Sequence, residues 1–202
     1  MKISLQNVGK RYNREWIFRH FNFEFSPSGS YAITGANGSG KSTLLQVIAG
    51  ATLHSEGQLL YDQQGGSIIE QPYSHIAIAA PYLELIEEFT ATELLAFHAG
   101  FKKLTAPVET ILQSVNLDKA ADKQIRYFSS GMKQRLKLAQ AFFSESEVLF
   151  LDEPTTNLDS EGLALYQNLV KNFAGKRLLL VSSNVPQEYE FCGEIIRMED
   201  FK

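Results

Sequence analysis

The sequence contains Gly35-Ala36-Asn37-Gly38-Ser39-Gly40-Lys41-Ser42-Thr43, and this stretch decides the fold. An apolar run, Tyr31-Ala32-Ile33, precedes it, and apolar residues at helical spacing follow it as far as Gly50. These flanks predict a buried strand, a glycine-rich loop and a helix, in that order. Glycines let the loop turn its N–H groups toward an anion, and the start of the helix adds unpaired donors. We therefore expect the stretch to hold the phosphates of a nucleotide.

Two side chains of the stretch add specific contacts. Lys41 is placed to reach the β- and γ-phosphates, and the Ser42 hydroxyl is a ligand for Mg²⁺. A glycine turn before an ordinary helix is the other interpretation, but the fixed spacing and both flanks favour a phosphate site. We expect every residue from Gly35 to Thr43 to take part in nucleotide binding.

The composition limits the class of protein. The chain has 202 residues, of which 44% are hydrophobic, and this suits one domain with a real core. Its formal net charge of −4 shows no sequence-wide basicity, so we expect no nucleic-acid partner. The single cysteine, Cys192, excludes an intrachain disulfide and favours a reducing compartment. No stretch approaches the length of a membrane-spanning helix, so a role at a membrane needs a partner.

The periodicity of the rest of the chain predicts β structure first and alternating helices and strands later. Strands are expected at 21–25, 57–61, 67–69, 75–79, 148–151, 178–181 and 194–198. Helices are expected at 131–143 and 160–173, with a longer helical region from 92 to 127. An α/β fold follows from this order.

A second group of chemical residues lies where an uninterrupted apolar run, 148–151, ends in Asp152 and Glu153. A strand buried on both faces brings its carboxyl end to the ligand crevice of a parallel sheet. Asp152 can hold Mg²⁺ directly or through water, and Glu153 can orient or deprotonate an attacking water. Acidic residues at strand ends are often structural, but the phosphate loop in the same chain favours the functional interpretation.

A third group, Ser129, Ser130 and Gly131, stands at the start of the helix predicted for 131–143. Serines suit the capping of a helix, and a helix start also binds anions. If this helix start serves phosphate as well, the chain has two anion-binding helix ends for one type of nucleotide.

Taken in this order, the motifs resemble the nucleotide-binding subunits of ABC transporters. The resemblance runs from Tyr12 to about Asn184. It includes the Walker A loop from Gly35 to Thr43, a signature segment at 128–132 that resembles LSGGQ, the Walker B strand with Asp152 and Glu153, and a D-loop-like segment at 157–159.

Tyr12 lies 23 residues before Gly35 and matches the aromatic residue that stacks on adenine in that family. A tyrosine at a strand edge is the other interpretation, and Trp16 is the alternative stacking residue.

The resemblance implies an α/β P-loop fold of ABC type, with a mixed core sheet, flanking helices, an N-terminal antiparallel β part and a small helical subdomain. One domain is expected, with its core at about 1–90 and 136–202 and the helical subdomain at about 91–135. ATP and Mg²⁺ would bind between the Walker loop of one chain and the signature helix of another. The ATP-driven pair would move a separate transmembrane permease subunit, with 92–127 as the docking region. This implies a cytoplasmic protein on the inner face of the membrane.

Two departures from the family pattern bear on hydrolysis. The glutamine that ligates Mg²⁺ in the family falls at Pro81, and Gln71 is ten residues too early to replace it. The histidine that contacts the γ-phosphate falls at Ser183, a neutral and shorter donor. Met132 and Ser130 also replace the signature glutamine and a signature glycine. We therefore expect intact ATP binding with slow hydrolysis, because losing a positioned catalytic group costs roughly 10² to 10⁴ in rate.

Other functions remain open at the level of sequence. A regulatory ATP-binding module with little turnover fits Pro81 and Ser183, but the intact Glu153 opposes it. An ABC protein acting on nucleic acid would resemble two fused copies or carry long coiled-coil insertions, and neither is present. A small-molecule P-loop kinase would not need the signature segment.

Overall fold

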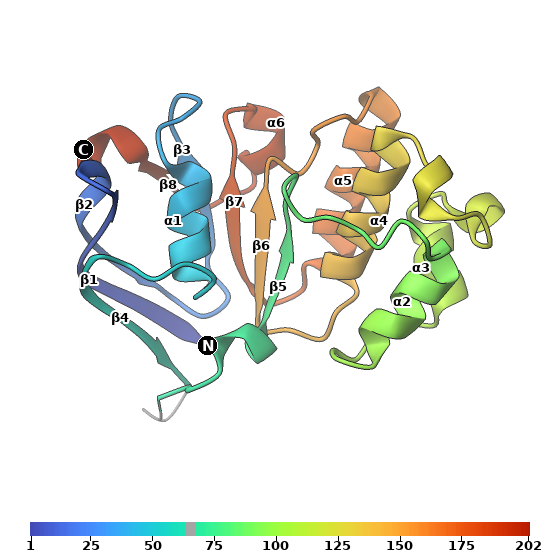
Figure 1. The fold of residues 1–202 in the computed structure, drawn as a ribbon, viewed down its shortest axis with the longest axis horizontal. Helices are drawn as coiled ribbons and strands as arrows, with labels where there is room; N and C mark the ends of the chain where they lie inside the picture. The colour runs from blue at the N-terminus through green and yellow to red at the C-terminus, as the bar shows by residue number, and fades with distance from the viewer. Residues whose placement is uncertain (64–67) are drawn as a thin grey trace.

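The computed structural model describes residues 1–63 and 68–202, and it contains two β-sheets (Figure 1). The smaller sheet is antiparallel, with the order β2-β1-β4. Its strands are β1 (Lys2–Tyr12), β2 (Glu15–Phe25) and β4 (Glu56–Asp62). The predicted Gly65-Gly66 turn and Ser67 lie outside the described residues, while Ile68 forms a single antiparallel bridge with Asp62. The expected N-terminal antiparallel part is confirmed, and β2 extends well beyond the predicted 21–25.

The larger sheet has five strands in the order β5-β6-β7-β3-β8. They are β5 (Ile76–Ala79), β6 (Val148–Asp152), β7 (Leu178–Ser182), β3 (Ser30–Thr34) and β8 (Glu194–Arg197). Each described pairing between neighbours in this sheet is parallel. We expected a mixed core sheet, but the described pairings of the core sheet are all parallel. Antiparallel pairing is found in the smaller sheet. Parallel strands bring their carboxyl ends to one edge, at the top of Figure 1.

The helices lie beside the core sheet and at one end of it (Figure 1). They are α1 (Lys41–Ile48), α2 (Ala91–Ala99), α3 (Val108–Ser114), α4 (Ser130–Phe142), α5 (Ser160–Phe173) and α6 (Pro186–Tyr189). Four short 3₁₀ helices complete the described elements: η1 (Pro72–His75), η2 (Asp118–Ala120), η3 (Ile125–Tyr127) and η4 (Met198–Phe201). The prediction of a helix at 160–173 is confirmed, and α4 begins one residue before the predicted start. No helix of the described residues combines the length and apolar character needed to cross a membrane.

The helical region predicted for 92–127 is broken into separate short elements. A capping box starts α2, because the Thr90 hydroxyl accepts from Glu93 N at 3.1 Å and the Glu93 carboxylate accepts from Thr90 N at 2.8 Å. Pro107 precedes α3 and prevents a continuous helix, since proline disfavours the helical conformation of the residue before it. Apolar periodicity alone does not reveal such breaks.

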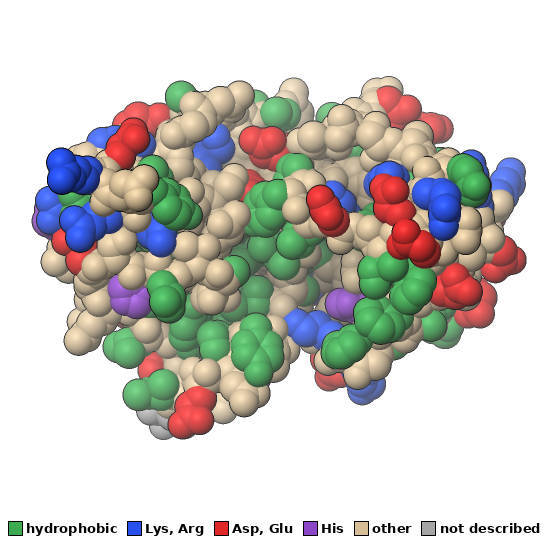
Figure 2. Space-filling model, in the orientation of Figure 1, with side chains coloured by type: hydrophobic (Ala, Val, Ile, Leu, Met, Phe, Trp, Pro, Cys, Tyr) green, Lys and Arg blue, Asp and Glu red, His purple; other side chains and the backbone are tan. Residues whose placement is uncertain are grey.

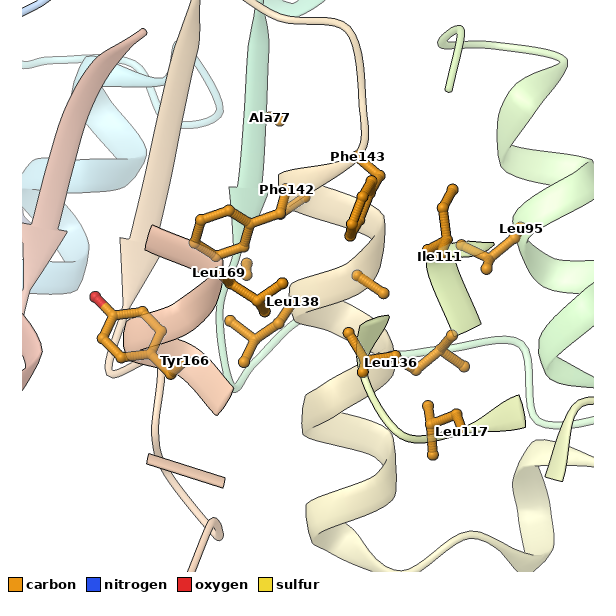
Figure 3. Close-up of a cluster of buried hydrophobic side chains, with 14 of the residues drawn as sticks. Ala77, Leu95, Ile111, Leu117, Leu136, Leu138, Phe142, Phe143, Tyr166 and Leu169 are labelled. Atoms are coloured by element: carbon orange, nitrogen blue, oxygen red, sulfur yellow. The ribbon is translucent and has the colours of Figure 1, made fainter. Parts of the chain in front are cut away.

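Two apolar clusters meet across β6. Leu149 and Leu151 belong to the cluster formed with the helices, part of which is drawn in Figure 3. Val148 and Phe150 point the other way, into the cluster beneath α1 and the antiparallel sheet. All four side chains are fully buried, which explains the uninterrupted apolar run in the sequence. A buried leucine of this kind contributes about 2–5 kcal/mol to stability relative to alanine. Because its side chains are packed on both faces, β6 is held firmly, and so are the residues at its carboxyl end.

Candidate nucleotide-binding site

The stretch from Gly35 to Gly40 connects β3 to α1 at the carboxyl edge of the core sheet (Figure 1). Gly38 and Gly40 have φ angles of 78° and 100°, in the left-handed region that favours glycine. A Cβ atom at Gly40 would also collide with the side chain of Ile17 on β2. The predicted order of strand, glycine loop and helix is present, and α1 begins directly at Lys41.

Lys41 is buried beneath the loop that precedes it. Its Nζ donates to the carbonyl oxygen of Gly35 at 2.8 Å and to that of Ala36 at 3.3 Å. A cavity of about 210 Å³ adjoins it and is lined by Ile17, Asn37, Gly38, Gly40, Lys41, Ser42, Thr43 and Glu153. The loop, the lysine and the start of α1 therefore face the same space. Such a concave set of N–H groups and one ammonium suits a chain of phosphates.

Asp152 ends β6 with only 1% of its surface exposed. Within the described residues, neither of its carboxylate oxygens has a hydrogen-bond partner. Burial raises the pKa of Asp152, and the charge of Glu153 adds to this; the nearby hydroxyls of Ser182 and Ser42 and the charge of Lys41 act in the opposite direction. The two hydroxyls come close to the carboxylate without making hydrogen bonds of normal geometry.

This arrangement fits a hard cation. A buried carboxylate without a partner is costly, and Mg²⁺ is bound by carboxylate and hydroxyl oxygens together with the phosphates of a substrate. Asp152 and Ser42 are the residues that would hold the ion. The predicted metal residues are thus brought together at one place.

Asp152→Asn is expected to raise the melting temperature of the protein when Mg²⁺ and nucleotide are absent. The amide keeps the shape of the side chain and removes a buried charge, and each 1 kcal/mol gained raises the melting temperature by about 2–4 °C at this chain length. Mg-ATP at 100 times its Kd stabilises a protein by about 2.7 kcal/mol, and we expect the variant to lose at least about half of this shift. Thermal unfolding with and without Mg-ATP measures both effects, with the exposed Asp122→Asn as the control. A lower melting temperature without ligand, or an unchanged shift with it, would contradict this interpretation.

Glu153 and Ser183 line a second cavity, of about 330 Å³, together with Asn37, Thr155, Thr156, Asn184, Val185 and Glu188. Asn37 and Glu153 also line the first cavity, so the two spaces adjoin. Glu153 has a φ angle of 43°, and its N–H donates to Ser182 O at 2.8 Å. This backbone conformation at the end of β6 is strained for a glutamate, and the residue borders both cavities.

The Ser183 hydroxyl accepts from Val185 N at 2.9 Å, which leaves its own proton free to donate. The residue is buried against β3, because its N–H donates to Ile33 O at 3.1 Å. The predicted catalytic residues Lys41, Glu153 and Ser183 therefore surround adjoining spaces.

Asn184 also contacts the phosphate loop, and the sequence did not predict this role. Its Oδ1 accepts from Gly35 N at 3.2 Å, and its Nδ2 donates to Asn37 Oδ1 at 3.2 Å. The amide thus connects the segment after β7 with both the first and the third residue of the phosphate loop. Its position directly after Ser183 was the only signal available in the sequence.

Ser129, Ser130 and Gly131 lie at the start of α4, away from the phosphate loop. The Ser129 hydroxyl caps the helix by accepting from Met132 N at 3.2 Å. These residues line a cavity of about 270 Å³ with Met132, Arg135, Asn157, Leu158 and Asp159. Among the described residues, this cavity shares no lining residue with the two beside the phosphate loop. One chain therefore does not bring together the two helix ends that were predicted to bind anions.

Tyr12 ends β1 beside the turn into β2, the strand that reaches the phosphate loop through Ile17. Its side chain is 48% exposed, with Lys10 Nζ 4.6 Å from the ring centroid. The ring of Trp16 is covered by two guanidinium groups, since Arg11 Cζ lies 5.4 Å and Arg19 Cζ 4.1 Å from its centroid. Tyr12 is thus the more accessible stacking surface of the two.

A family model described as "ABC transporter" matches residues 18–156 of the chain. The chain belongs to the ABC transporter family. Among curated relatives, the lantibiotic transport ATP-binding protein SrtF of Streptococcus pyogenes is 26% identical over 96% of this chain and 85% of its own length. The Nod factor export ATP-binding protein I of Rhizobium johnstonii is 30% identical over 98% of this chain and 66% of its own length.

A solved structure shows the same fold as this ABC family member. It is the dimeric structure of a post-hydrolysis state of an ATP-binding cassette bound to ADP and Pi. The two chains superpose with a TM-score of 0.77 at 23% identity, covering 96% of this chain and 93% of the other. The expected ABC-type fold is confirmed by this likeness.

The carbonyl oxygen of Pro81, where the resemblance predicts a Mg²⁺-binding glutamine, accepts from Lys137 Nζ at 2.8 Å. Gln71 precedes the first residue of β5, whereas Asp152 is the last residue of the neighbouring strand β6. Four residues of strand span about 13 Å, so Gln71 does not replace the missing glutamine. Tyr82 lies nearer the site: burial raises its pKa to about 12, and the charge of Asp152 adds to this shift.

Proposed function

We propose that the chain is the ATP-binding and ATP-hydrolysing subunit of an ABC transporter. The observation that carries the proposal is the unpartnered buried carboxylate of Asp152 beside the phosphate loop, with Glu153 lining the adjoining space. These residues come from segments more than one hundred positions apart, and a purely structural role would leave no buried acid without a partner. Residues 1–202 would act as one ATPase domain, with 91–135 as its helical subdomain.

Each group would act on a different part of Mg-ATP. The N–H groups of the loop and of the start of α1 would bind the phosphates, and Lys41 would leave its two carbonyl partners for the β- and γ-phosphates. Ser42 and Asp152 would hold Mg²⁺, which neutralises charge on the phosphates when bound. Glu153 would orient the attacking water and take its proton, while the Ser183 hydroxyl would donate to the γ-phosphate. Tyr12 would stack on the adenine.

We further propose that ATP is bound between two copies of this chain, arranged head to tail. The support is the separation of the phosphate loop from Ser129–Gly131, which leaves each half of the site facing outward. Two copies of the chain supply two phosphate loops and two α4 starts. A symmetric dimer would therefore complete two nucleotide sites without a further chain. The solved relative with ADP and Pi is a dimer. ATP binding would close the pair, and hydrolysis would open it.

The partner moved by this cycle would be a transmembrane permease subunit. Both relatives named above are described as ATP-binding proteins, one of lantibiotic transport and one of Nod factor export. The chain would then lie on the cytoplasmic side of the membrane, held there by the permease. The surface formed by α2 and α3 would be the docking region.

A steady-state ATPase assay tests this function and separates it from a regulatory module that binds ATP without turning it over. We expect Mg²⁺-dependent release of phosphate, slow by the standard of the family because Pro81 and Ser183 replace two polar groups at the site. Binding of Mg-ATP with no phosphate release above that of the Glu153→Gln variant would favour the regulatory module.

Ser183→His is expected to raise the turnover number by about tenfold or more. Histidine restores a longer donor, and a positioned acid-base group contributes about 10² to 10⁴ to a rate. The cavity of about 330 Å³ in front of Ser183 provides space for the imidazole ring. The turnover number is compared, in the presence of the permease, with that of wild type and of Ser74→His, which places the same ring at an exposed serine outside both cavities. An unchanged rate in a folded Ser183→His variant would remove Ser183 as the cause of slow hydrolysis.

A further inference from the structure

The 3₁₀ helix η4 and the residue after it lie against the phosphate loop from behind. Ala36 N donates to Glu199 Oε1 at 3.3 Å, and Lys202 Nζ donates to Ser39 O at 2.8 Å. The two side chains thus contact the beginning and the end of the loop. We propose that Glu199 and Lys202 are positioning residues that hold the phosphate loop open for ATP, an inference that rests on the proposed nucleotide site.

The contact of Glu199 with the loop is close as well as polar. A Cβ atom at Gly35 would lie 2.8 Å from Ser39 Oγ within the loop, and 3.1 Å from both Glu199 Oε1 and Met198 Cβ of η4. These distances are shorter than ordinary van der Waals contacts. A side chain at Gly35 would therefore push η4 away, and glycine allows η4 to pack this close to the loop. Gly35 therefore has a second reason to be glycine, besides its φ angle of 146°.

Lys202 connects the loop to the antiparallel sheet. Its Nζ also donates to the carbonyl oxygen of Ile17 at 3.0 Å, and the Ile17 side chain lies against Gly40. The same ammonium therefore binds a carbonyl of the loop and a carbonyl of β2. Because Ser39 O is fixed in this way, the N–H groups that follow it keep their direction toward the phosphates.

The element that carries these side chains is itself anchored in the core. Met198 is fully buried, and its Cε lies 3.5 Å from the position of a Cβ atom on Gly40. The ring of Phe201 packs on that of Phe21, with 4.3 Å between centroids. Glu199 and Lys202 thus project from a fixed support, and this is needed if they are to hold a loop in place.

Electrostatics alone predicts the opposite effect for Glu199. A carboxylate close to bound phosphates repels them, so its removal would tighten binding if charge were the only factor. Lys and Arg side chains gather at the end of the molecule where Figure 1 places β2 and the C-terminus, and they reduce this repulsion (Figure 2). The geometric role and the charge effect therefore have opposite signs, which an experiment can separate.

The test compares Glu199→Ala and Glu199→Gln by the Kd of Mg-ATP and by KM and kcat. We expect Glu199→Ala to raise Kd and KM by about three- to tenfold, with kcat unchanged, because one hydrogen bond that shapes the loop is lost. Glu199→Gln keeps the acceptor, so its Kd should stay within about twofold of wild type or fall. Asp200→Ala, on the same element, is the matched control and should leave Kd unchanged.

Lys202→Ala is a second variant, which tests the proposal independently if Glu199→Ala proves to lower the melting temperature. It removes the hydrogen bond to Ser39 O, and we expect it to raise the Kd of Mg-ATP by about three- to tenfold as well. The proposal is overturned if wild type binds Mg-ATP and both alanine variants bind it equally well or better. It is also overturned if Glu199→Gln weakens binding as much as Glu199→Ala does. Failure of wild type itself to bind Mg-ATP would refute the nucleotide site as a whole, so the two failures are distinct.

Discussion

Lys41→Ala is expected to weaken the binding of Mg-ATP by about 10- to 100-fold. The ammonium group is buried under the phosphate loop, and its partners among the described residues are two carbonyl oxygens, so phosphate oxygens are the better ligands for it. A charge-assisted hydrogen bond contributes about 1.5–3 kcal/mol, and 1.4 kcal/mol corresponds to a tenfold change in Kd. The variant also loses the contacts that Lys41 makes with Gly35 and Ala36.

Isothermal titration with Mg-ATP measures this change. Lys103→Ala is the control, because Lys103 is exposed and its only described partner is Glu145 at 3.4 Å. We expect its Kd to match wild type. A folded Lys41→Ala variant that binds Mg-ATP as tightly as wild type would show that the loop is not the phosphate site.

Glu153→Gln is expected to lower the turnover number by about 10² to 10⁴ and to leave the Kd of Mg-ATP nearly unchanged. Glutamine keeps the size of the side chain and can still orient a water molecule, but it cannot take a proton from it. The strained φ angle of 43° and the hydrogen bond to Ser182 O belong to the backbone, so the substitution retains both.

Release of phosphate at saturating Mg-ATP measures the effect of Glu153→Gln. Glu161→Gln is the matched control, because Glu161 lies in the first turn of α5 with its side chain exposed. Turnover equal to wild type in the Glu153→Gln variant would assign the general base to another residue, and Glu188 in the same cavity would be the next candidate.

The sequence predicts well those parts of the fold that depend on local spacing. The strand, loop and helix around Gly35–Thr43 were predictable because glycine spacing and apolar periodicity act over a few residues. The buried strand β6 was predictable because a strand covered on both faces is apolar throughout. The helix at 160–173 was predictable from its apolar periodicity, and the structure adds that the Asp159 side chain caps it.

Contacts between distant segments were not predictable in this way. Asn184, Glu199 and Lys202 meet the phosphate loop only because β7, β3 and β8 are neighbours in the core sheet, and strand order leaves no local signature. The hydrogen bond from Lys137 to Pro81 has the same origin, since α4 packs beside β5. The breaks in the 92–127 region were missed because the apolar stripe continues across Pro107.

Mg-ATP would join two copies of this chain at a shared site. The most direct measurement is the molar mass of Glu153→Gln by light scattering after size exclusion, with and without Mg-ATP. We predict a monomer without nucleotide and twice that mass with Mg-ATP, and we predict that Lys41→Ala introduced into the same chain abolishes the change. A mass that stays at that of the monomer while Mg-ATP is bound would contradict the claim.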